Sequence, residues 1–186
     1  MRIVGGRLKG RVLRGPSSSA IRPTSDRLRE SLFNILVHAY DDPADGGRVI
    51  DLFAGTGALG LEAVSRGAKF ALLVDDGSEA RALIRGNVEA LGLGGSTRIF
   101  RRDARKLGDA PQGEKFTLAF LDPPYSKGLA EPALAALHEG AWLEPGALVI
   151  VEEEASVSVA LPAAFTQLEH RDYGDTQILI CRYGAV

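Results

Sequence analysis

Asp51-Leu52-Phe53-Ala54-Gly55-Thr56-Gly57-Ala58-Leu59-Gly60 is the stretch that decides the fold of this 186-residue chain. The apolar residues 49–53 predict a buried strand, and residues 58–65 predict a helix that begins directly after the glycines. Glycines between a strand and a helix let the chain turn sharply and let its backbone approach a ligand closely. The spacing matches the G-x-G-x-x-G pattern of sites for NAD, FAD or S-adenosylmethionine, and a tight turn without a ligand is the alternative.

The residues beyond this stretch alternate between predicted strands and predicted helices. Helices are expected at 78–91 and 129–137, and strands at 70–74, 97–100, 116–121 and 147–151. Strands that are apolar on both faces and separated by helices predict an α/β fold, with a mostly parallel sheet between two helical layers. The last two strands, at 165–171 and 176–182, are joined by a tight turn, which predicts an antiparallel hairpin at the sheet edge.

The first 40 residues are expected to form an extension that precedes this sheet. Residues 2–14 alternate β-prone pairs with glycines and basic residues, which predicts a small hairpin. A helix is then expected to begin near Thr24 or Ser25, either of which can serve as its N-cap. The following loop is rich in Asp, Pro and Gly, and we expect it to separate the extension (1–40) from the main domain (41–186).

Charge is distributed unevenly along the chain. Residues 1–38 carry a net charge of +6 and the remainder a net charge of −8. A basic arm on an acidic body points to a nucleic-acid partner, and a solvated charged hairpin is the alternative. Basic residues near a helix N-terminus oppose the helix dipole, so a phosphate or another negative group gives a better reason for them. The expected contacts with the substrate are Arg7, Lys9, Arg11, Arg22, Thr24, Arg27 and Arg29.

Composition excludes several other classes of protein. Cys181 is the single cysteine, so the chain forms no internal disulfide, and its apolar surroundings predict a buried thiol. The three histidines have no partners at ligand spacing, and we expect no metal site. The sequence shows neither a signal peptide nor a membrane span, so we expect a cytoplasmic protein without membrane contact. We also expect a monomer.

Two aspartates are expected beside the glycine stretch because they follow the next two strands. Asp75 ends the second strand, where a carboxylate can accept hydrogen bonds from a ribose diol. A ribose is present in both NAD and S-adenosylmethionine, so Asp75 does not separate them. Asp103 follows the third strand and could accept a hydrogen bond from an adenine amino group, or could instead be a capping or surface residue.

Asp122-Pro123-Pro124-Tyr125 follows the apolar strand 116–121 and favours one kind of chemistry. Ligands bind at the carboxyl ends of strands in open parallel sheets, and two prolines stiffen the loop there. An exocyclic amine offers hydrogens rather than a lone pair, so Asp122 and the Pro123 carbonyl can orient its nitrogen towards an electrophilic methyl group. Tyr125 can stack on the face of the base, an interaction worth about 1–3 kcal/mol. Hydride-transfer enzymes have no use for this arrangement.

This motif resembles the D/N-P-P-Y/F motif of methyltransferases that act on exocyclic amines of adenine, cytosine and guanine. Over nearly the whole chain the sequence is similar to the bacterial 16S ribosomal RNA guanine-N2-methyltransferases that modify guanine 966, the RsmD family. The resemblance is carried by residues 2–6 with 9–10, and by residues 22–36, 51–67 and 173–176. The second of these stretches is the most specific, because methyltransferases in general lack it.

The resemblance implies a Rossmann-like class I methyltransferase fold, a seven-stranded sheet with an antiparallel last strand. It implies methyl transfer from S-adenosylmethionine to guanine N2 of 16S rRNA, within a 30S particle or an assembly intermediate. It places catalysis at Asp122, Pro123, Pro124 and Tyr125. The expected cofactor contacts are Asp51, Phe53, Ala54, Gly55, Thr56, Gly57, Asp75, Asp103 and Ala104. Asp75-Asp76 stands where similar proteins read Glu followed by Lys, and the shorter carboxylate should still reach a diol.

Two alternatives remain open from the sequence. A DNA or other RNA methyltransferase acting on adenine N6 or cytosine N4 shares the chemistry, although such DNA enzymes usually carry a separate target-recognition region. A non-catalytic RNA-binding assembly factor could keep the same fold, although the intact motifs at Asp51, Gly55, Asp75 and Asp122 argue against it.

Overall fold

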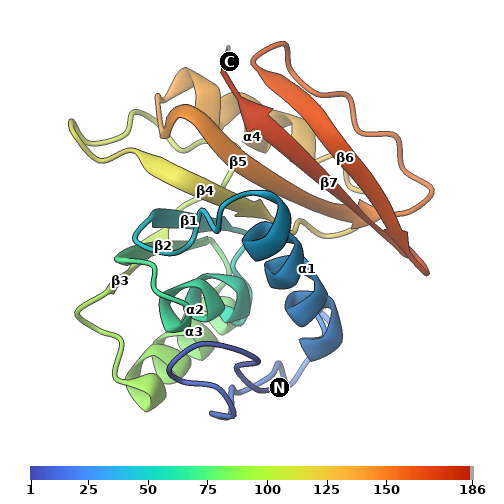
Figure 1. Ribbon diagram of the computed structural model, residues 1–186. Helices are drawn as coiled ribbons and strands as arrows, with labels where there is room; N and C mark the ends of the chain where they lie inside the picture. Colours follow the sequence, from blue (N-terminus) through green and yellow to red (C-terminus); the bar gives the residue numbers. More distant parts are fainter. Residues whose placement is uncertain (185–186) are drawn as a thin grey trace.

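The computed structural model describes residues 1–184 and contains one seven-stranded sheet in the order β3-β2-β1-β4-β5-β7-β6 (Figure 1). The strands are β1 (Arg48–Leu52), β2 (Phe70–Asp75), β3 (Thr97–Arg101), β4 (Phe116–Leu121), β5 (Leu143–Glu154), β6 (Phe165–Tyr173) and β7 (Thr176–Tyr183). The helices are α1 (Asp26–Ala39), α2 (Ala58–Ser65), α3 (Ser78–Leu91) and α4 (Ala130–Glu139).

The directions of the strands confirm the predicted topology. Strands β1 to β5 pair in parallel, whereas β7 lies antiparallel between β5 and β6. One boundary differs, because β5 begins at Leu143 rather than at residue 147. Pro145 and Gly146 look like a turn in the sequence, but Leu143 already pairs with Phe116 before the register shifts.

Two hydrophobic layers cover the two faces of the sheet. Helices α1, α2 and α3 lie on one face, where Phe33 of α1 packs against Phe120 of β4. Helix α4 covers the other face together with Trp142 and Leu107. In α3 the buried residues recur at helical spacing: Ala80, Ile84, Asn87, Val88 and Leu91. The predicted sheet between two helical layers is therefore confirmed.

The amino-terminal loop folds back on itself without forming two regular strands. A single antiparallel bridge joins Arg2 to Val12, and the Ile3 amide donates to the Arg11 carbonyl at 2.9 Å. The expected hairpin is therefore present in irregular form, because the amides of Val4, Gly5 and Arg7 donate to α2 and not across the hairpin. Ile3 and Leu13 are buried in the core formed by α1, α2 and α3.

A buried ion pair ties this loop to the helices. Ser25, one of the two predicted candidates, is the N-cap of α1, and its hydroxyl accepts a hydrogen bond from the Leu28 amide. One turn later, Arg29 is fully buried, and its Nε lies 3.6 Å from Oε1 of the equally buried Glu62 in α2. Glu62 in turn accepts the backbone amides of Val4 and Gly5. The first 30 residues thus pack as an integral part of the domain.

No helix within residues 1–184 has both the length and the apolar character that crossing a membrane requires.

Candidate functional site

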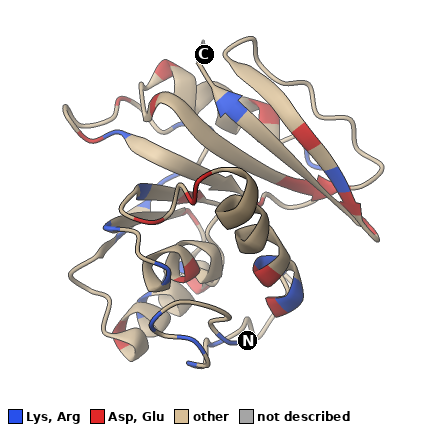
Figure 2. Ribbon diagram, viewed as in Figure 1, with Lys and Arg blue, Asp and Glu red and all other residues tan. Residues whose placement is uncertain are grey.

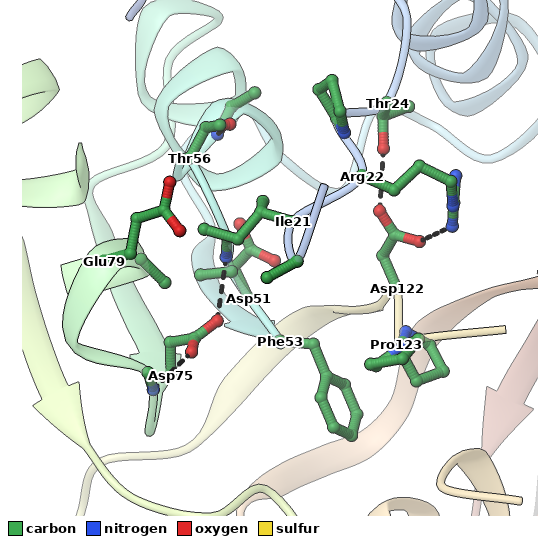
Figure 3. A pocket seen from close by; sticks show the side chains of 18 of the residues that line it. Ile21, Arg22, Thr24, Asp51, Phe53, Thr56, Asp75, Glu79, Asp122 and Pro123 are labelled. Carbon is green, nitrogen blue, oxygen red and sulfur yellow. Dashed lines mark hydrogen bonds and ion pairs between the residues drawn. The ribbon is translucent and has the colours of Figure 1, made fainter. Parts of the chain in front are cut away.

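A cleft of about 650 Å³ opens at the carboxyl ends of β1, β2 and β4 (Figure 3). One wall is the glycine loop after β1, and the opposite wall is the loop 122–125 after β4. Residues 19–24, which we call the strap, line the cleft between the two loops. The glycine loop and the proline loop therefore converge on one cavity, as the sequence predicts.

The glycine loop is held by two aspartates from the strands beneath it. Asp51 is buried, and its Oδ2 accepts the Gly60 amide at 3.0 Å, so it already occupies one donor of the α2 N-terminus. Burial raises the pKa of Asp51 to about 8. Gly55 has a φ of +62°, and a side chain there would approach Ile21 of the strap. Gly57 faces the core beneath the turn and does not line the cleft.

Asp75 stands at the tip of β2 directly beside this loop. Its Oδ2 accepts the Gly55 amide at 3.0 Å and its Oδ1 accepts the Gly77 amide at 2.9 Å. Each oxygen keeps a further lone pair that can accept a hydroxyl hydrogen. Burial raises the pKa of Asp75, although the two amides oppose that shift. The carboxylate is thus fixed in place and still has free acceptor capacity on the cleft side.

Asp103 and Ala104 line a smaller neighbouring cavity of about 110 Å³. Phe53 and Asp75 line both this cavity and the main cleft. Arg105 Nη2 lies 2.7 Å from Asp103 Oδ2, and this hydrogen bond lowers the pKa of Asp103. The expected contact between Asp103 and an adenine stays a prediction. The adenine amino group would have to use a carboxylate lone pair of Asp103 that is not already bonded to Arg105.

Asp122 lies at the end of β4 and faces the strap. Its Oδ1 accepts Arg22 Nη2 at 2.9 Å, and its Oδ2 accepts the Thr24 hydroxyl at 2.9 Å (Figure 3). Burial raises the pKa of Asp122 well above its ordinary value, and the charge of Glu152 adds to this effect, while Arg22 and Thr24 oppose it. Asp122 can therefore hold a proton more readily than an exposed carboxylate.

Tyr125 and the two prolines complete this wall of the cleft. The Arg22 guanidinium lies over the Tyr125 ring, with Cζ 3.5 Å from the ring centroid. Burial raises the pKa of the Tyr125 phenol to about 12, so the hydroxyl stays protonated. It hydrogen-bonds to Thr176 of β7 and lies 3.4 Å from Glu152 Oε1. The hydrogen bond to Thr176 thereby fixes the position of the Tyr125 ring against β7.

Glu152 is the residue of this site that the sequence interpretation missed. It belongs to β5, is 4% exposed, and lies 3.6 Å from Arg22 Nη1. The sequence carries a partial signal, because an acidic residue directly follows the apolar run 147–151 of a predicted strand, as Asp122 follows the strand 116–121. The observed register pairs Leu121 with Val151, which brings the next residues of both strands together.

The basic residues expected to contact RNA fall into separate places. Arg7, Lys9 and Arg11 are exposed on the amino-terminal loop, whose basic segments lie near the chain's N-terminus (Figure 2). The Arg7 amide donates to Ser65 and the Arg11 guanidinium to Ala90, at the carboxyl ends of α2 and α3. Both helices begin at the cleft, and α2 has 8 residues whereas α3 has 14. Their lengths therefore place Arg7 about 12 Å and Arg11 about 20 Å from the cleft.

The residues of the stretch 22–29 also divide by burial. Arg22 lines the cleft and Arg27 is exposed on α1. The prediction that Arg29 contacts RNA is wrong for this conformation, because its guanidinium is fully buried and bonded to Thr24, Asp26 and the Arg2 carbonyl. Thr24 is 6% exposed and directs its hydroxyl to Asp122, which gives it a positioning role in this site.

No group of three or more His, Cys, Asp or Glu side chains within residues 1–184 is arranged to hold a metal ion. Cys181 is buried as expected, and burial raises its pKa to about 12, so the thiol remains protonated.

Known proteins are similar to this chain over most of its length. The family described as conserved hypothetical protein 95 matches residues 1–182. Ribosomal RNA small subunit methyltransferase D of Escherichia coli K12 is 40% identical over 155 residues, covering 83% of this chain and 75% of that protein. The Haemophilus influenzae protein of the same name is 33% identical over 176 residues, covering 94% and 89%.

The fold agrees with these sequence relationships. The solved structure of the Escherichia coli protein yhhF superimposes with a TM-score of 0.83 at 31% identity, covering 100% of this chain and 99% of that one. The sequence resemblance and the predicted class I methyltransferase fold are thus confirmed. The chain belongs to the conserved hypothetical protein 95 family, which it shares with the ribosomal RNA small subunit methyltransferase D proteins.

Proposed function

We propose that this protein transfers a methyl group from S-adenosylmethionine to the exocyclic N2 amine of a guanine in 16S rRNA, which the family resemblance implies to be guanine 966. Relatives at 33% to 40% identity are named as small-subunit rRNA methyltransferases. The observation that carries the proposal is the position of Asp122, whose carboxylate faces the same cleft as the glycine loop and Asp75. An amine held by Asp122 would therefore lie opposite whatever the glycine loop binds.

The residues of the glycine loop fit S-adenosylmethionine. Asp75 keeps acceptor lone pairs for a ribose diol, and Gly55 leaves room for close backbone approach. Asp51 lines the same cleft and would accept a hydrogen bond from the ammonium group of the cofactor's amino-acid end, whose positive charge would favour the ionised carboxylate. Asp103 with Ala104 would meet the adenine. When bound, this cofactor supplies a methyl group on a positively charged sulfur, which makes that carbon electrophilic.

The chain's own residues would then act mainly by positioning. Asp122 and the Pro123 carbonyl accept the two amine hydrogens, which directs the nitrogen lone pair out of the base plane. The amine nitrogen held by Asp122 and Pro123 would bond to the methyl carbon that the cofactor supplies, and the broken carbon–sulfur bond would leave its electron pair on the sulfur. The nitrogen then loses one proton to Asp122, whose burial suits it to hold that proton before solvent removes it. Tyr125 would stack on the base once Arg22 has left its ring.

The substrate guanine must leave the RNA stack to reach this cleft, which costs a few kcal/mol. The exposed basic residues Arg7, Lys9, Arg11 and Arg27 are proposed to offset this cost by contacts with the RNA backbone. Their distance from the cleft favours an extended RNA surface, such as that of a 30S particle or assembly intermediate.

Labelled methyl transfer tests the proposal. Wild-type protein should methylate 16S rRNA or immature 30S particles and leave DNA unmodified, with the product guanine identified by mass mapping. Asp122→Ala should lower turnover by about 100-fold or more while binding S-adenosylmethionine normally by calorimetry. Asp172→Ala, at an exposed position of β6, should behave as wild type. Methyl transfer to adenine or cytosine, or cofactor binding without transfer to any nucleic acid, would contradict the proposal.

A further inference from the structure

Arg22 lies with its guanidinium between Tyr125 and the two carboxylates Asp122 and Glu152. Its guanidinium is planar and stacks on Tyr125, with Cζ 3.5 Å from the ring centroid. Two different nitrogens of this group face two different carboxylates, Nη2 at 2.9 Å from Asp122 and Nη1 at 3.6 Å from Glu152. The site thus receives a flat group that presents two adjacent N–H donors from one trigonal carbon.

Glu152 is poorly satisfied by the protein that surrounds it. Its nearest polar partners are the Thr24 hydroxyl at 3.3 Å, the Tyr125 hydroxyl at 3.4 Å and Arg22 at 3.6 Å. The single Thr24 hydrogen can serve only one carboxylate at a time, and it lies closer to Asp122. A buried carboxylate with only distant donors is costly, so a closer donor is expected when the site is in use.

The Watson–Crick edge of guanine has the same pattern of donors as a guanidinium. Its N1–H and its N2 amine are attached to one ring carbon and point the same way. In adenine and cytosine the amine stands beside a ring nitrogen that carries a lone pair instead of a hydrogen. A second carboxylate beside Asp122 would attract guanine N1–H and repel that lone pair.

We propose that Glu152 determines specificity by accepting guanine N1–H while Asp122 holds the N2 amine, and that Arg22 fills this place until RNA enters. This inference rests on the proposed function, since it names how the same site selects its base. Arg22 must swing off Tyr125 before a base can stack there, and its side chain is 41% exposed, which leaves it a path to solvent.

The test replaces the methylated guanine of the RNA by 2-aminopurine, which keeps the N2 amine but has a lone pair at N1. Wild-type enzyme should methylate the 2-aminopurine RNA at least about 100-fold more slowly than the guanine RNA. A site with a buried acceptor for a hydrogen-bond donor discriminates strongly against an analogue that lacks the donor. Glu152→Gln offers an amide that can donate to N1 or accept from it, and should narrow this ratio at least about tenfold. Glu144→Gln, at an exposed position of the same strand, should keep the wild-type ratio.

Each outcome has a distinct meaning. Wild-type enzyme that methylates no guanine RNA contradicts the proposed function itself. Wild-type enzyme that methylates both RNAs equally overturns the role of Glu152 even if the variant fails to fold. A folded Glu152→Gln, shown by unchanged melting and cofactor binding, that keeps the full wild-type ratio overturns it as well.

Discussion

Replacing Arg29 by Met tests whether this arginine is structural, as its burial indicates, rather than a contact for RNA. The guanidinium donates to the carbonyls of Thr24 and Arg2 and to the Asp26 carboxylate. Met fills much of the same volume but offers no donor, so two backbone carbonyls and the buried Glu62 lose a cationic neighbour. We therefore expect a large loss of stability from this one substitution.

The size of the loss follows from these contacts. Hydrogen bonds to a charged group contribute about 1.5–3 kcal/mol each, and two of the three acceptors are backbone carbonyls that would lose this donor. Glu62 keeps Arg66 and two amides, and the buried Met recovers some apolar burial. The expected cost is about 3–5 kcal/mol, the range for breaking a buried ion pair. For a chain of this size that lowers the melting temperature by about 6–20 °C.

Urea unfolding of Arg29→Met beside Arg27→Met provides the assay. Arg27 lies on the same helix two residues away and is exposed, so its replacement should change stability by less than about 0.5 kcal/mol. A cost under about 1 kcal/mol for Arg29→Met, or equal costs for both variants, would refute the structural interpretation of Arg29.

Three other predictions concern the walls of the cleft. The pKa of Asp51 is about 8 in the folded chain against an ordinary 3.8, so between these pH values the folded chain binds more protons than the unfolded chain. The free energy of unfolding should therefore fall as pH rises through that window. Measured by urea unfolding from pH 5 to pH 8, it should depend less on pH in Asp51→Asn than in the wild type. Gly60→Ala should cost about 1–3 kcal/mol in the same assay, because its Cβ would collide with Leu73, and an unchanged midpoint would contradict that packing. Tyr125→Phe should keep most methyl transfer whereas Tyr125→Ala should lose it, since stacking requires the ring; equal rates for the two variants would count against a stacking role.

The sheet could be predicted from sequence because its signals are local. Apolar runs of five or six residues predict the strands of a parallel sheet when they are separated by segments whose apolar residues recur at helical spacing. Residues 48–75 contain two such runs with a helix between them. The irregular start of β5 could not be predicted, since Pro145 and Gly146 resemble a turn until the neighbouring strand is known. The amino-terminal hairpin is less regular than the sequence predicts for a similar reason, because the amides of Val4, Gly5 and Arg7 donate to α2, a partner distant in the sequence.

The site was predictable to the extent that its residues stand at the ends of strands. Asp75 and Asp122 could be placed on one edge because parallel strands end together. The burial of Arg29 could not be foreseen, since its partner Glu62 lies 33 residues away and the charge alone suggests an exposed group. Glu152 required the register between β4 and β5, which no local pattern in the sequence specifies.

The strap is synthesised early, but the residues that hold it in place are synthesised late. In the strap, Thr24 must wait for Asp122 and Arg22 for Glu152 before their hydrogen bond and ion pair can form, and the Arg14 amide just before the strap must wait for Asn87. Contacts between such distant residues form late because their loops are entropically expensive to close. On the ribosome, the nascent amino-terminal segment therefore remains without its partners until most of the polypeptide has emerged, and the cleft is completed only near the end of translation.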